Sequence, residues 1–213
     1  MNLVSKLRSR VKTGTISAMP PVLKNFARNA PPTTPAQWRN FVKKLTEAFY
    51  KRFWFYHPVK CGGAPWQFVS RPRMRGHTEV YTCPNGTRRE FKRFADPKNF
   101  FKWRYGRGGE FAQGLYSVLK FLGFRSRLCL GFWGGRADAV WVEVWHPWTR
   151  TWVTVNPTVP HGYGWKFPKA HMKVWALETA NGQVVNRTKN YVCKKGCLPT
   201  FAESRRRFKA LSS

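Results

Sequence analysis

YGRGGEFAQGLYS, residues Tyr105–Ser117, is the stretch that decides the fold prediction, because it has the composition of a turn followed by a helix. Its glycines mark the turn, and a helix is predicted from about Glu110 to Leu122. The apolar side chains at helical spacing are Phe111, Leu115, Val118, Leu119 and Leu122. Gly123 is the predicted stop signal. The sequence therefore predicts a helix with one buried face.

An earlier helix and a later series of strands complete the predicted core. The earlier helix opens at Thr34-Pro35, and its apolar positions are Trp38, Phe41, Val42, Leu45 and Phe49. Residues 57–105 are predicted to be irregular. Strands are predicted at residues 127–133, 139–145, 151–155 and 172–178. Helices followed by a meander of strands predict an α+β fold with an antiparallel sheet.

Three short stretches in this order carry a resemblance to a known family: GRGGEF at residues 106–111, DAVWVEV at 138–144, and Asn156-Pro157. They are similar to the Gly-Arg-Cys-Gly-Glu-Trp, Asp-His-Val-Trp-Thr-Glu-Val and Asp-Pro motifs of the peptide:N-glycanases. These are cytosolic deglycosylating amidases with the transglutaminase-like (papain-like) fold. The resemblance is collinear over residues 57–192 and implies a transglutaminase-like core, in which a helix packs on an antiparallel sheet.

The resemblance also implies that the catalytic site has lost its reactive groups. In the family the three positions hold a cysteine nucleophile, a histidine base and a carboxylate that orients the histidine. Here they hold Gly108, Ala139 and Asn156. Glycine has no side chain to attack with and alanine accepts no proton, and the members of such a triad act as a unit. We therefore expect a pseudoenzyme. Cys129, within an apolar strand, is expected to be a buried structural residue rather than a relocated nucleophile.

The zinc site that the resemblance implies is also eroded. The family holds zinc with two Cys-x-x-Cys pairs, and here the second cysteine of each pair remains, as Cys61 and Cys83, while Pro58 and Val80 occupy the first positions. Two thiolates do not complete a tetrahedral zinc site. Replacement ligands would have to come from His57, His77, Cys193 or Cys197. We expect no cofactor, and two leftover thiols in a packed loop.

The charge of the chain is its strongest functional signal. The sequence has 39 Lys and Arg against 9 Asp and Glu, a formal net charge of +30. A compact protein with this charge repels itself unless an anionic partner neutralises it, and nucleic acid is the commonest such partner. Basic residues beside aromatic ones favour contacts with phosphates and unpaired bases. The candidate RNA-contact residues are Lys6, Arg8, Arg10, Lys12, Lys51, Arg52, Arg88, Arg89, Lys92, Arg93, Arg205, Arg206, Arg207 and Lys209.

The chain divides by composition into three parts. Residues 1–35 are predicted to form a basic N-terminal arm or a mitochondrial targeting segment, because no acidic residue precedes Glu47. Residues 36–192 form the degenerate domain, and residues 193–213 form a basic C-terminal tail with a short helix. Irregularly spaced cysteines and the lack of a recognisable secretory signal or membrane span predict a reducing compartment.

Together these features predict a non-catalytic, RNA-binding structural component of a large ribonucleoprotein. The specific hypothesis is a mitochondrial ribosomal protein of the matrix, with ribosomal RNA and neighbouring ribosomal proteins as partners. The alternatives are a ribosome assembly factor, or a DNA-binding repair scaffold with an inactive transglutaminase-like domain, and the alternative locations are nuclear and cytoplasmic. Gly108 and Ala139 disfavour an active amidase. We expect neither a membrane partner nor a small-molecule substrate.

Overall fold

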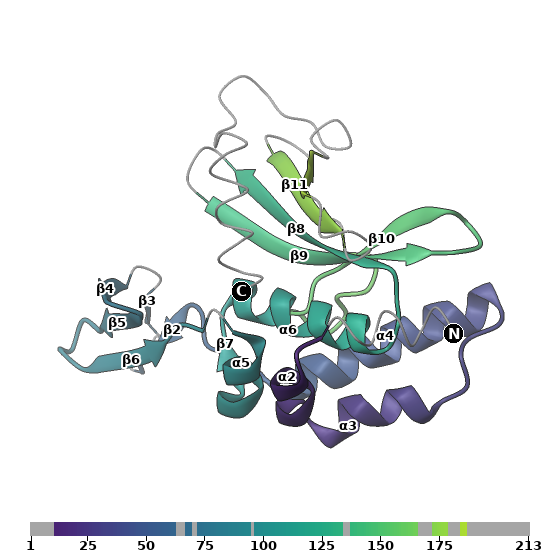
Figure 1. Ribbon diagram of the computed structural model, residues 1–213. Coiled ribbons are helices and arrows are strands. Elements are labelled where there is room, and N and C mark those ends of the chain that lie inside the picture. The colour runs from purple at the N-terminus through teal and green to yellow at the C-terminus, as the bar shows by residue number, and fades with distance from the viewer. Residues whose placement is uncertain are drawn as a thin grey trace.

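The computed structural model describes residues 11–62, 67–69, 72–94, 96–133, 137–165, 172–178 and 184–186 (Figure 1). The helices are α2 (Thr13–Ala18), α3 (Pro21–Lys24), the 3-10 helix η1 (Asn25–Arg28), α4 (Pro35–Arg52), α5 (Pro97–Trp103) and α6 (Gly108–Phe121). The first strands are β1 (Trp54–Phe55), β2 (Val59–Lys60), β3 (Phe68–Val69), β4 (Arg73–Arg75), β5 (Thr78–Thr82), β6 (Arg88–Lys92) and β7 (Tyr105–Gly106). The later strands are β8 (Ser126–Trp133), β9 (Ala137–His146), β10 (Thr151–Val155), β11 (Met172–Glu178) and β12 (Val184–Asn186).

A five-stranded sheet and the helices beside it form the centre of the fold. The strand order is β10-β9-β8-β11-β12, and every neighbouring pair is antiparallel. Figure 1 shows α6 and α4 on the same side of this sheet. A helix layer on an antiparallel sheet is the α+β architecture that the sequence predicts, so the fold class is confirmed.

The core lies between the sheet and these helices. Its buried members from α4, α6 and the sheet are Trp38, Val42, Leu45, Phe49, Phe111, Ala112, Leu115, Tyr116, Val118, Leu119, Leu128, Val142, Val144 and Val155. This set confirms the two apolar helix faces predicted from spacing, although Phe41 and Leu122 are only partly buried. Each large apolar side chain removed from water in this way contributes roughly 1.5–3 kcal/mol.

The strand predictions are confirmed with small differences at the ends. β10 and β11 have the predicted bounds, while β8 and β9 extend slightly beyond them. The helix α6 begins at Gly108 rather than at Glu110. In α4, the Thr34 hydroxyl accepts a hydrogen bond from the backbone N–H of Gln37 at 3.2 Å, which is the N-cap that the Thr-Pro pair predicts.

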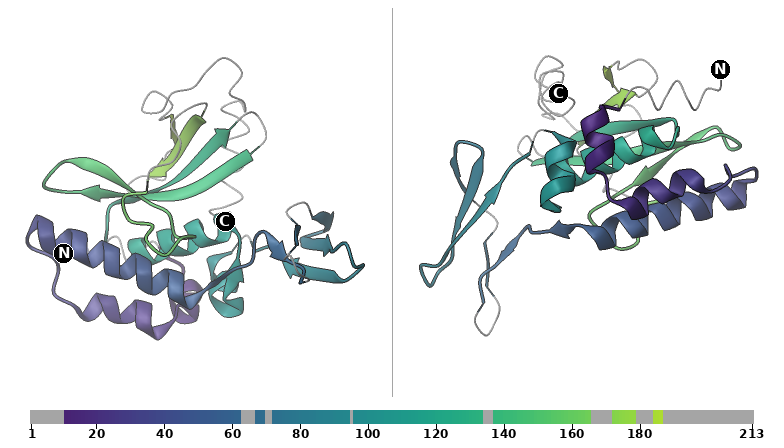
Figure 2. Two further views of the ribbon diagram at one scale, coloured as in Figure 1. Left: turned by 180° about the vertical axis from the view of Figure 1, so that it is seen from behind. Right: turned by 60° about the horizontal axis from the view of Figure 1, so that its bottom comes forward.

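The prediction that residues 57–105 are irregular is wrong. The strands β4, β5 and β6 form a three-stranded antiparallel sheet, the small sheet, which projects to one side of the body (Figures 1 and 2). Tyr81 and Phe91 from the small sheet pack with Tyr56 and Val59 in a second apolar cluster. Because most other side chains of β4 and β6 are exposed, the sequence lacks the alternation that reveals a half-buried strand.

Part of the expected basic arm packs into the body of the protein. Residues 11–28 contain α2, α3 and η1, and Met19 and Leu23 are buried in the same core as α4. In sequence, these apolar residues lie between the exposed cations Lys12 and Arg28. The segment is therefore basic in composition but has an apolar side that faces the core. Residues 1–10 and the expected tail at 193–213 lie outside the described residues.

Candidate functional site

The first position of the expected triad is at the N-terminus of α6. Gly108 is the first residue of this helix, and the N-cap residue Arg107 has an extended backbone. A Cβ added to Gly108 would meet no described atom within 4 Å beyond its chain neighbours and its own helix backbone. The position therefore has the space and the helix N-terminus that favour a thiolate, but it carries only hydrogen.

The second and third positions lie on the central sheet. Ala139 belongs to β9, where it pairs with Gly131 of β8. Asn156 follows β10, and its Oδ1 accepts hydrogen bonds from the backbone N–H and the hydroxyl of Thr158 at 3.1 and 2.7 Å. A Cβ on Gly162 would overlap the Asn156 carbonyl oxygen, so this turn requires glycine there. The Asn156 amide oxygen therefore closes a local turn, and the three positions together offer no ionisable group.

A buried carboxylate that the sequence analysis did not assign holds the first turn of α6. Glu110 is 3% exposed and accepts hydrogen bonds from the backbone N–H of Arg107 at 3.2 Å and of Phe94 at 3.3 Å. The Arg93 guanidinium donates to the same carboxylate through Nε and, at 3.0 Å, through Nη2. Because Glu110 returns to the N-cap backbone, it fixes where the helix begins.

Glu79 of β5 is a second buried carboxylate, and it joins the small sheet to α6. Its Oε1 accepts hydrogen bonds from Arg93 and Arg107, both at 2.7 Å. Its Oε2 accepts from the hydroxyls of Tyr56 at 2.9 Å and Tyr81 at 2.8 Å. Burial alone would raise the pKa of Glu79, but the hydrogen bonds from Tyr81, Arg107 and Arg93 outweigh it and lower the pKa from 4.5 to about 2. We call Glu79, Arg93, Arg107 and Glu110 the glutamate–arginine network.

His57 extends this network but does not supply a free base. Its Nδ1 lies 3.3 Å from the Tyr81 hydroxyl, and its Nε2 lies 3.4 Å from the Arg107 guanidinium. Since a guanidinium only donates, Nε2 accepts and the ring proton is on Nδ1. Burial, with the positive charge of Arg107 added to it, lowers the pKa of His57. The imidazole is therefore neutral, and both of its nitrogens are used in structural hydrogen bonds.

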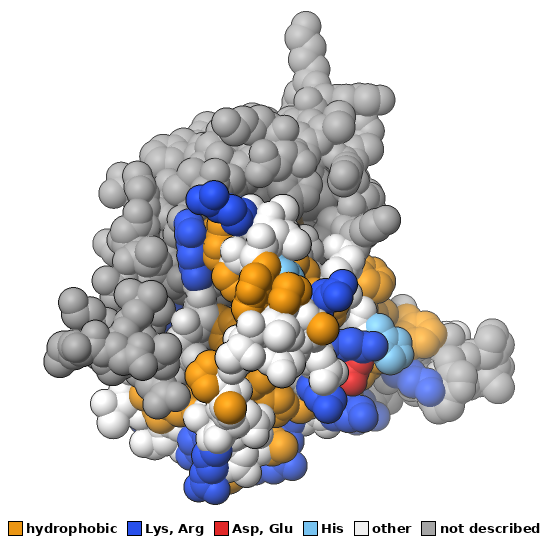
Figure 3. Space-filling view, turned by 90° about the vertical axis from the view of Figure 1, so that its right-hand side faces the viewer, with side chains coloured by type: hydrophobic (Ala, Val, Ile, Leu, Met, Phe, Trp, Pro, Cys, Tyr) orange, Lys and Arg blue, Asp and Glu red, His pale blue; other side chains and the backbone are white. Residues whose placement is uncertain are grey.

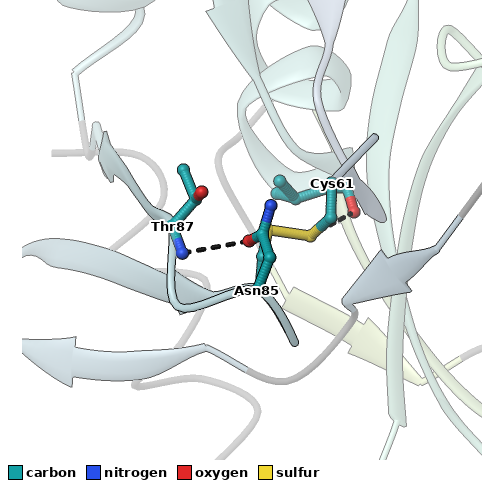
Figure 4. The surroundings of a disulfide bond; sticks show 5 residues. Cys61, Asn85 and Thr87 are labelled. Carbon is teal, nitrogen blue, oxygen red and sulfur yellow. Dashed lines mark hydrogen bonds between the residues drawn. A yellow bond between two sulfur atoms is a disulfide. The ribbon is translucent and has the colours of Figure 1, made fainter. Parts of the chain in front are cut away.

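The two cysteines expected to be free thiols are joined by a disulfide (Figure 4). The Cα atoms of Cys61 and Cys83 lie 5.6 Å apart. Cys61 follows β2 and Cys83 follows β5, and Val59 of β2 packs with Tyr81 of β5 in one apolar cluster. A turn after Cys83 is closed by the Asn85 side chain, which accepts a hydrogen bond from the backbone N–H of Thr87 at 3.0 Å. Both sulfurs are consumed, so these residues do not fit the zinc ion that the resemblance implies. Among the described residues, no three His, Cys, Asp or Glu side chains gather closely enough to hold a metal.

Cys129 is fully buried on β8, as the sequence predicts. Burial and the nearby carboxylate of Glu143 raise the pKa of its thiol well above the ordinary value. Glu143 itself forms a buried ion pair with Arg127, whose guanidinium lies 4.0 Å from the centre of the Trp152 ring. A protonated thiol in this position is not a nucleophile.

The predicted RNA-contact residues differ in their surroundings. The exposed ones among the described residues are Lys12, Lys51, Arg52, Arg88, Arg89 and Lys92. Arg93 is instead partly buried, and its guanidinium is paired with the two buried carboxylates of Glu79 and Glu110. Lys6, Arg8, Arg10, Arg205, Arg206, Arg207 and Lys209 lie outside the described residues. Over the described ranges, no helix is both long and apolar enough to cross a membrane.

One face of the molecule has apolar side chains at its centre and Lys and Arg around them (Figure 3). A groove of about 310 Å³ is lined by aromatic residues of η1, of α4, of the segment before β8 and of the end of β9 with the turn that follows it. These aromatic residues are Phe26, Trp38, Phe41, Phe124, Trp145 and Trp148. Arg125 is the one charged side chain in this lining, and it lies 4.7 Å from the Trp145 ring centre.

The sequence contains a signal for the glutamate–arginine network that lies outside the predicted site residues. The chain has only 9 Asp and Glu among 213 residues, so each acid in an apolar stretch needs an identifiable partner. Glu110 stands directly before Phe111 in the buried helix, and Glu79 shares a strand face with Tyr81 in TEVYT. The partner arginines come from other elements, which only the fold brings together.

Comparison with known proteins gives matches to one superfamily. Residues 77–165 match the model of the transglutaminase-like superfamily. The chain is 33% identical over 132 residues to a peptide-N(4)-(N-acetyl-beta-glucosaminyl)asparagine amidase of Candida glabrata, covering 55% of this chain and 37% of that protein. It is 34% identical over 129 residues to the amidase of the same name from Kluyveromyces lactis, covering 54% and 35%. The chain thus spans little more than a third of the length of these relatives.

Two solved structures are similar in arrangement. One comes from work on β-hairpin motifs in DNA duplex opening by the Rad4/XPC nucleotide excision repair complex, with a TM-score of 0.49 and 15% identity. The other is Rad4-Rad23 bound to a 6-4 photoproduct UV lesion, with a TM-score of 0.48 and 14% identity. Each match covers 99% of this chain and 50% of the other chain.

Proposed function

This chain is a peptide:N-glycanase-like member of the transglutaminase-like superfamily, and we propose that it acts as a non-catalytic scaffold that binds nucleic acid. The observation that carries the proposal is the combination of a formal charge of +30 with a site whose three key positions hold Gly108, Ala139 and Asn156. A charge of this size favours an anionic partner, and the three positions offer no side chain that could attack a substrate or take a proton from it.

The non-catalytic part of the proposal follows from the site. Amide hydrolysis by this fold needs a nucleophile at the helix N-terminus and a base beside it. Gly108 offers neither, alanine at position 139 accepts no proton, and the Asn156 amide oxygen is committed to Thr158. The nearby His57 is held between Tyr81 and Arg107 and is not a substitute base.

The nucleic-acid part of the proposal follows from how the charges are distributed. Glu79, Glu110 and Glu143 are buried and paired with arginines, so they do not offset the exposed cations. Exposed cations instead include Arg88 and Arg89 on β6 and others on the ends of helices. Binding of a polyanion releases the counterions that condense on it, which makes association favourable and dependent on salt.

Two specific forms of this function differ in the nucleic acid. One is an RNA-bound component of the mitochondrial ribosome, or a factor in its assembly. The other is a DNA-binding repair scaffold. RNA and DNA present the same phosphate groups, so the charges of this chain do not distinguish the two forms. A binding experiment with both kinds of nucleic acid does.

The test is a binding titration of the full-length chain by fluorescence anisotropy. The labelled probes are a structured ribosomal RNA fragment, a duplex DNA with a mismatched bubble, and the fully paired duplex, with vesicles containing phosphatidylserine as a competing polyanion. We expect binding to nucleic acid that weakens steeply between about 50 and 200 mM salt. Replacing Arg88 and Arg89 by Gln is expected to reduce the salt slope by about 0.9 per lost phosphate contact, while the matched control Glu90→Gln leaves the slope unreduced.

Each outcome bears on the proposal. Preference for the RNA supports the ribosomal form, and preference for the bubble supports the repair form. Failure to bind any of the three nucleic acids, or binding to the vesicles alone, overturns the proposed function.

A further inference from the structure

A row of aromatic rings runs along the junction between the small sheet and α5. Trp54 of β1 pairs with Tyr105 of β7, and their ring centres are 6.5 Å apart. The Tyr105 ring lies 5.4 Å from that of Phe94, and Phe94 lies 6.4 Å from Trp103 with the two planes 7° apart. Figure 1 shows β7 and α5 side by side at this junction. Four rings from three separate segments therefore form one continuous row, which we call the aromatic row.

The two ends of the aromatic row are exposed, while its middle is not. Trp54 is 60% exposed and Trp103 is 48% exposed, whereas Phe94 is 9% exposed. Phe91, which is also buried, supports Trp54 from the inside at a ring distance of 5.6 Å. Two indole rings that are about half exposed, each packed against a buried ring of the protein, offer apolar surface to a partner.

Cations surround the exposed end at Trp103. The Nζ atoms of Lys92 and Lys102 lie 5.6 and 5.8 Å from the centre of its ring. The backbone N–H of Lys92 donates to the Tyr105 hydroxyl at 3.3 Å, which ties β6 to the aromatic row. The ammonium groups of Lys92 and Lys102 therefore lie within reach of any ligand that contacts the Trp103 ring.

Further cations flank the other rings. Arg52, the last residue of α4, and Arg104, between Trp103 and Tyr105 in sequence, are both exposed. The backbone carbonyl of Arg104 accepts a hydrogen bond from the Trp54 N–H at 2.9 Å, so Arg104 lies directly beside Trp54. The exposed acid on β6 is Glu90, which shares its strand face with Lys92. Cations therefore outnumber acids around the aromatic row.

We infer that Trp54 and Trp103 form a stacking platform for unpaired bases of a single-stranded nucleic acid, with Lys92 and Lys102 contacting its phosphates. This inference rests on the proposed function and specifies the form of nucleic acid at this surface. The bases of a duplex are stacked on one another, so an exposed indole can stack only on bases that are unpaired. Aromatic faces bordered by cations match the alternation of base and phosphate along a single strand.

The experiment compares single-stranded and duplex oligonucleotides of the same sequence, with the full-length chain and variants at the two indoles. Trp103→Leu keeps an apolar side chain but removes the aromatic face, and Trp103→Phe restores an aromatic face. The matched control is Trp165→Leu, at an indole outside the aromatic row that is 40% exposed. Binding is followed by anisotropy of a labelled 15-nucleotide single strand, about the upper range of one binding site for this class of surface, and folding of each variant is checked by its Tm.

The platform predicts that Trp103→Leu and Trp54→Leu each weaken single-strand binding by about 5- to 100-fold. Trp103→Phe is expected to retain most of the affinity, and Trp165→Leu to lose none. The salt slope of Trp103→Leu should equal that of the wild type, whereas Lys102→Gln should reduce it by about 0.7.

Three results would overturn the platform. If the chain binds nucleic acid but Trp103→Leu and Trp54→Leu weaken binding no more than Trp165→Leu, the platform is wrong and the proposed function stands. The same conclusion follows if only duplexes bind. If no nucleic acid binds at all, the proposed function and the platform both fail.

Discussion

The expected triad positions and the glutamate–arginine network have opposite chemical character, although both include a residue of the first turn of α6, Gly108 and Glu110. The triad positions offer Gly108 with open space beside it and an Asn156 side chain that closes a local turn. The glutamate–arginine network, one turn away, is complete: both carboxylates are buried and each accepts several hydrogen bonds. The difference indicates that the ion pairs and hydrogen bonds that hold the first turn of α6 support the fold. Reactive side chains at the triad positions are not needed for the chain to fold.

The largest expected effect is in the network. Glu110→Gln keeps the shape of the side chain but removes one of the two buried negative charges that pair with the Arg93 guanidinium, leaving Glu79 as the other. It also replaces a carboxylate oxygen by an NH2 donor among the N–H groups of Arg93, Phe94 and Arg107. We expect the free energy of unfolding to fall by about 3–5 kcal/mol, measured by urea denaturation. The matched control is Glu90→Gln, on exposed β6, which should change stability by no more than about 0.5 kcal/mol. Equal effects of the two changes would show that the network does not support the fold.

A second effect concerns pH. The pKa of Glu79 in the folded protein is about 2, below its ordinary value of 4.5, so folding favours the ionised carboxylate. Its stabilisation is fully present above about pH 4.5 and is lost as the pH falls towards 2, because the unfolded chain takes up the proton first. Glu79→Gln should lower stability at pH 7 by about 3 kcal/mol and flatten the loss of stability between those pH values. Denaturation curves recorded from pH 7 to 2 check this, and parallel pH dependences of variant and wild type would contradict it.

The third effect is confined to the small sheet. The disulfide links residues 22 apart in sequence, Cys61 and Cys83, and opening a loop of this size removes up to about 3 kcal/mol of stabilisation in the chain-entropy account. Hydrogen exchange with and without a reductant should show faster exchange in β4–β6 and no change in β8 and β9. Cys83→Ser should reproduce the effect of the reductant. Faster exchange throughout the central sheet would mean that the two sheets unfold as one unit.

The smallest effect is expected at the triad position itself. Gly108→Cys places a side chain in open space in the first helical turn, so stability should change by less than about 1 kcal/mol. The new thiol should react readily with iodoacetamide, because a helix N-terminus favours the thiolate. Gly114→Cys is the matched contrast, since its Cβ would lie 2.6 Å from the Phe100 ring and should cost about 1–3 kcal/mol. Comparable destabilisation at the two glycines would contradict the open site.

Local patterns predicted the parts of the fold in which they are strong. The Thr34-Pro35 pair and the apolar spacing of α4 and α6 gave helices whose predicted faces are buried. The strand signals in residues 151–155 predicted β10 with its observed bounds. These elements bury one side against a single core, so their periodicity is visible in the sequence.

What the sequence did not predict depends on contacts between distant segments. The small sheet has few inward side chains, chiefly Tyr81 and Phe91, so its strands show little alternation. The Cys61–Cys83 bond depends on two strands lying side by side, which cysteine spacing does not reveal. Glu79 and Glu110 share Arg93 only because β5, β6 and α6 meet. The expectation of a pseudoenzyme depends only on the residue identities at 108 and 139 and on the family resemblance, and it stays a prediction.

The most direct test of the central claim is an assay for glycan release. The full-length wild-type chain is incubated with a denatured N-glycoprotein, with an active peptide:N-glycanase as positive control, and released glycan is measured by mass spectrometry. The absence of a nucleophile at Gly108 predicts no release above the uncatalysed background. Turnover by the wild-type chain would contradict the account, because it would require a catalytic group that the site does not contain.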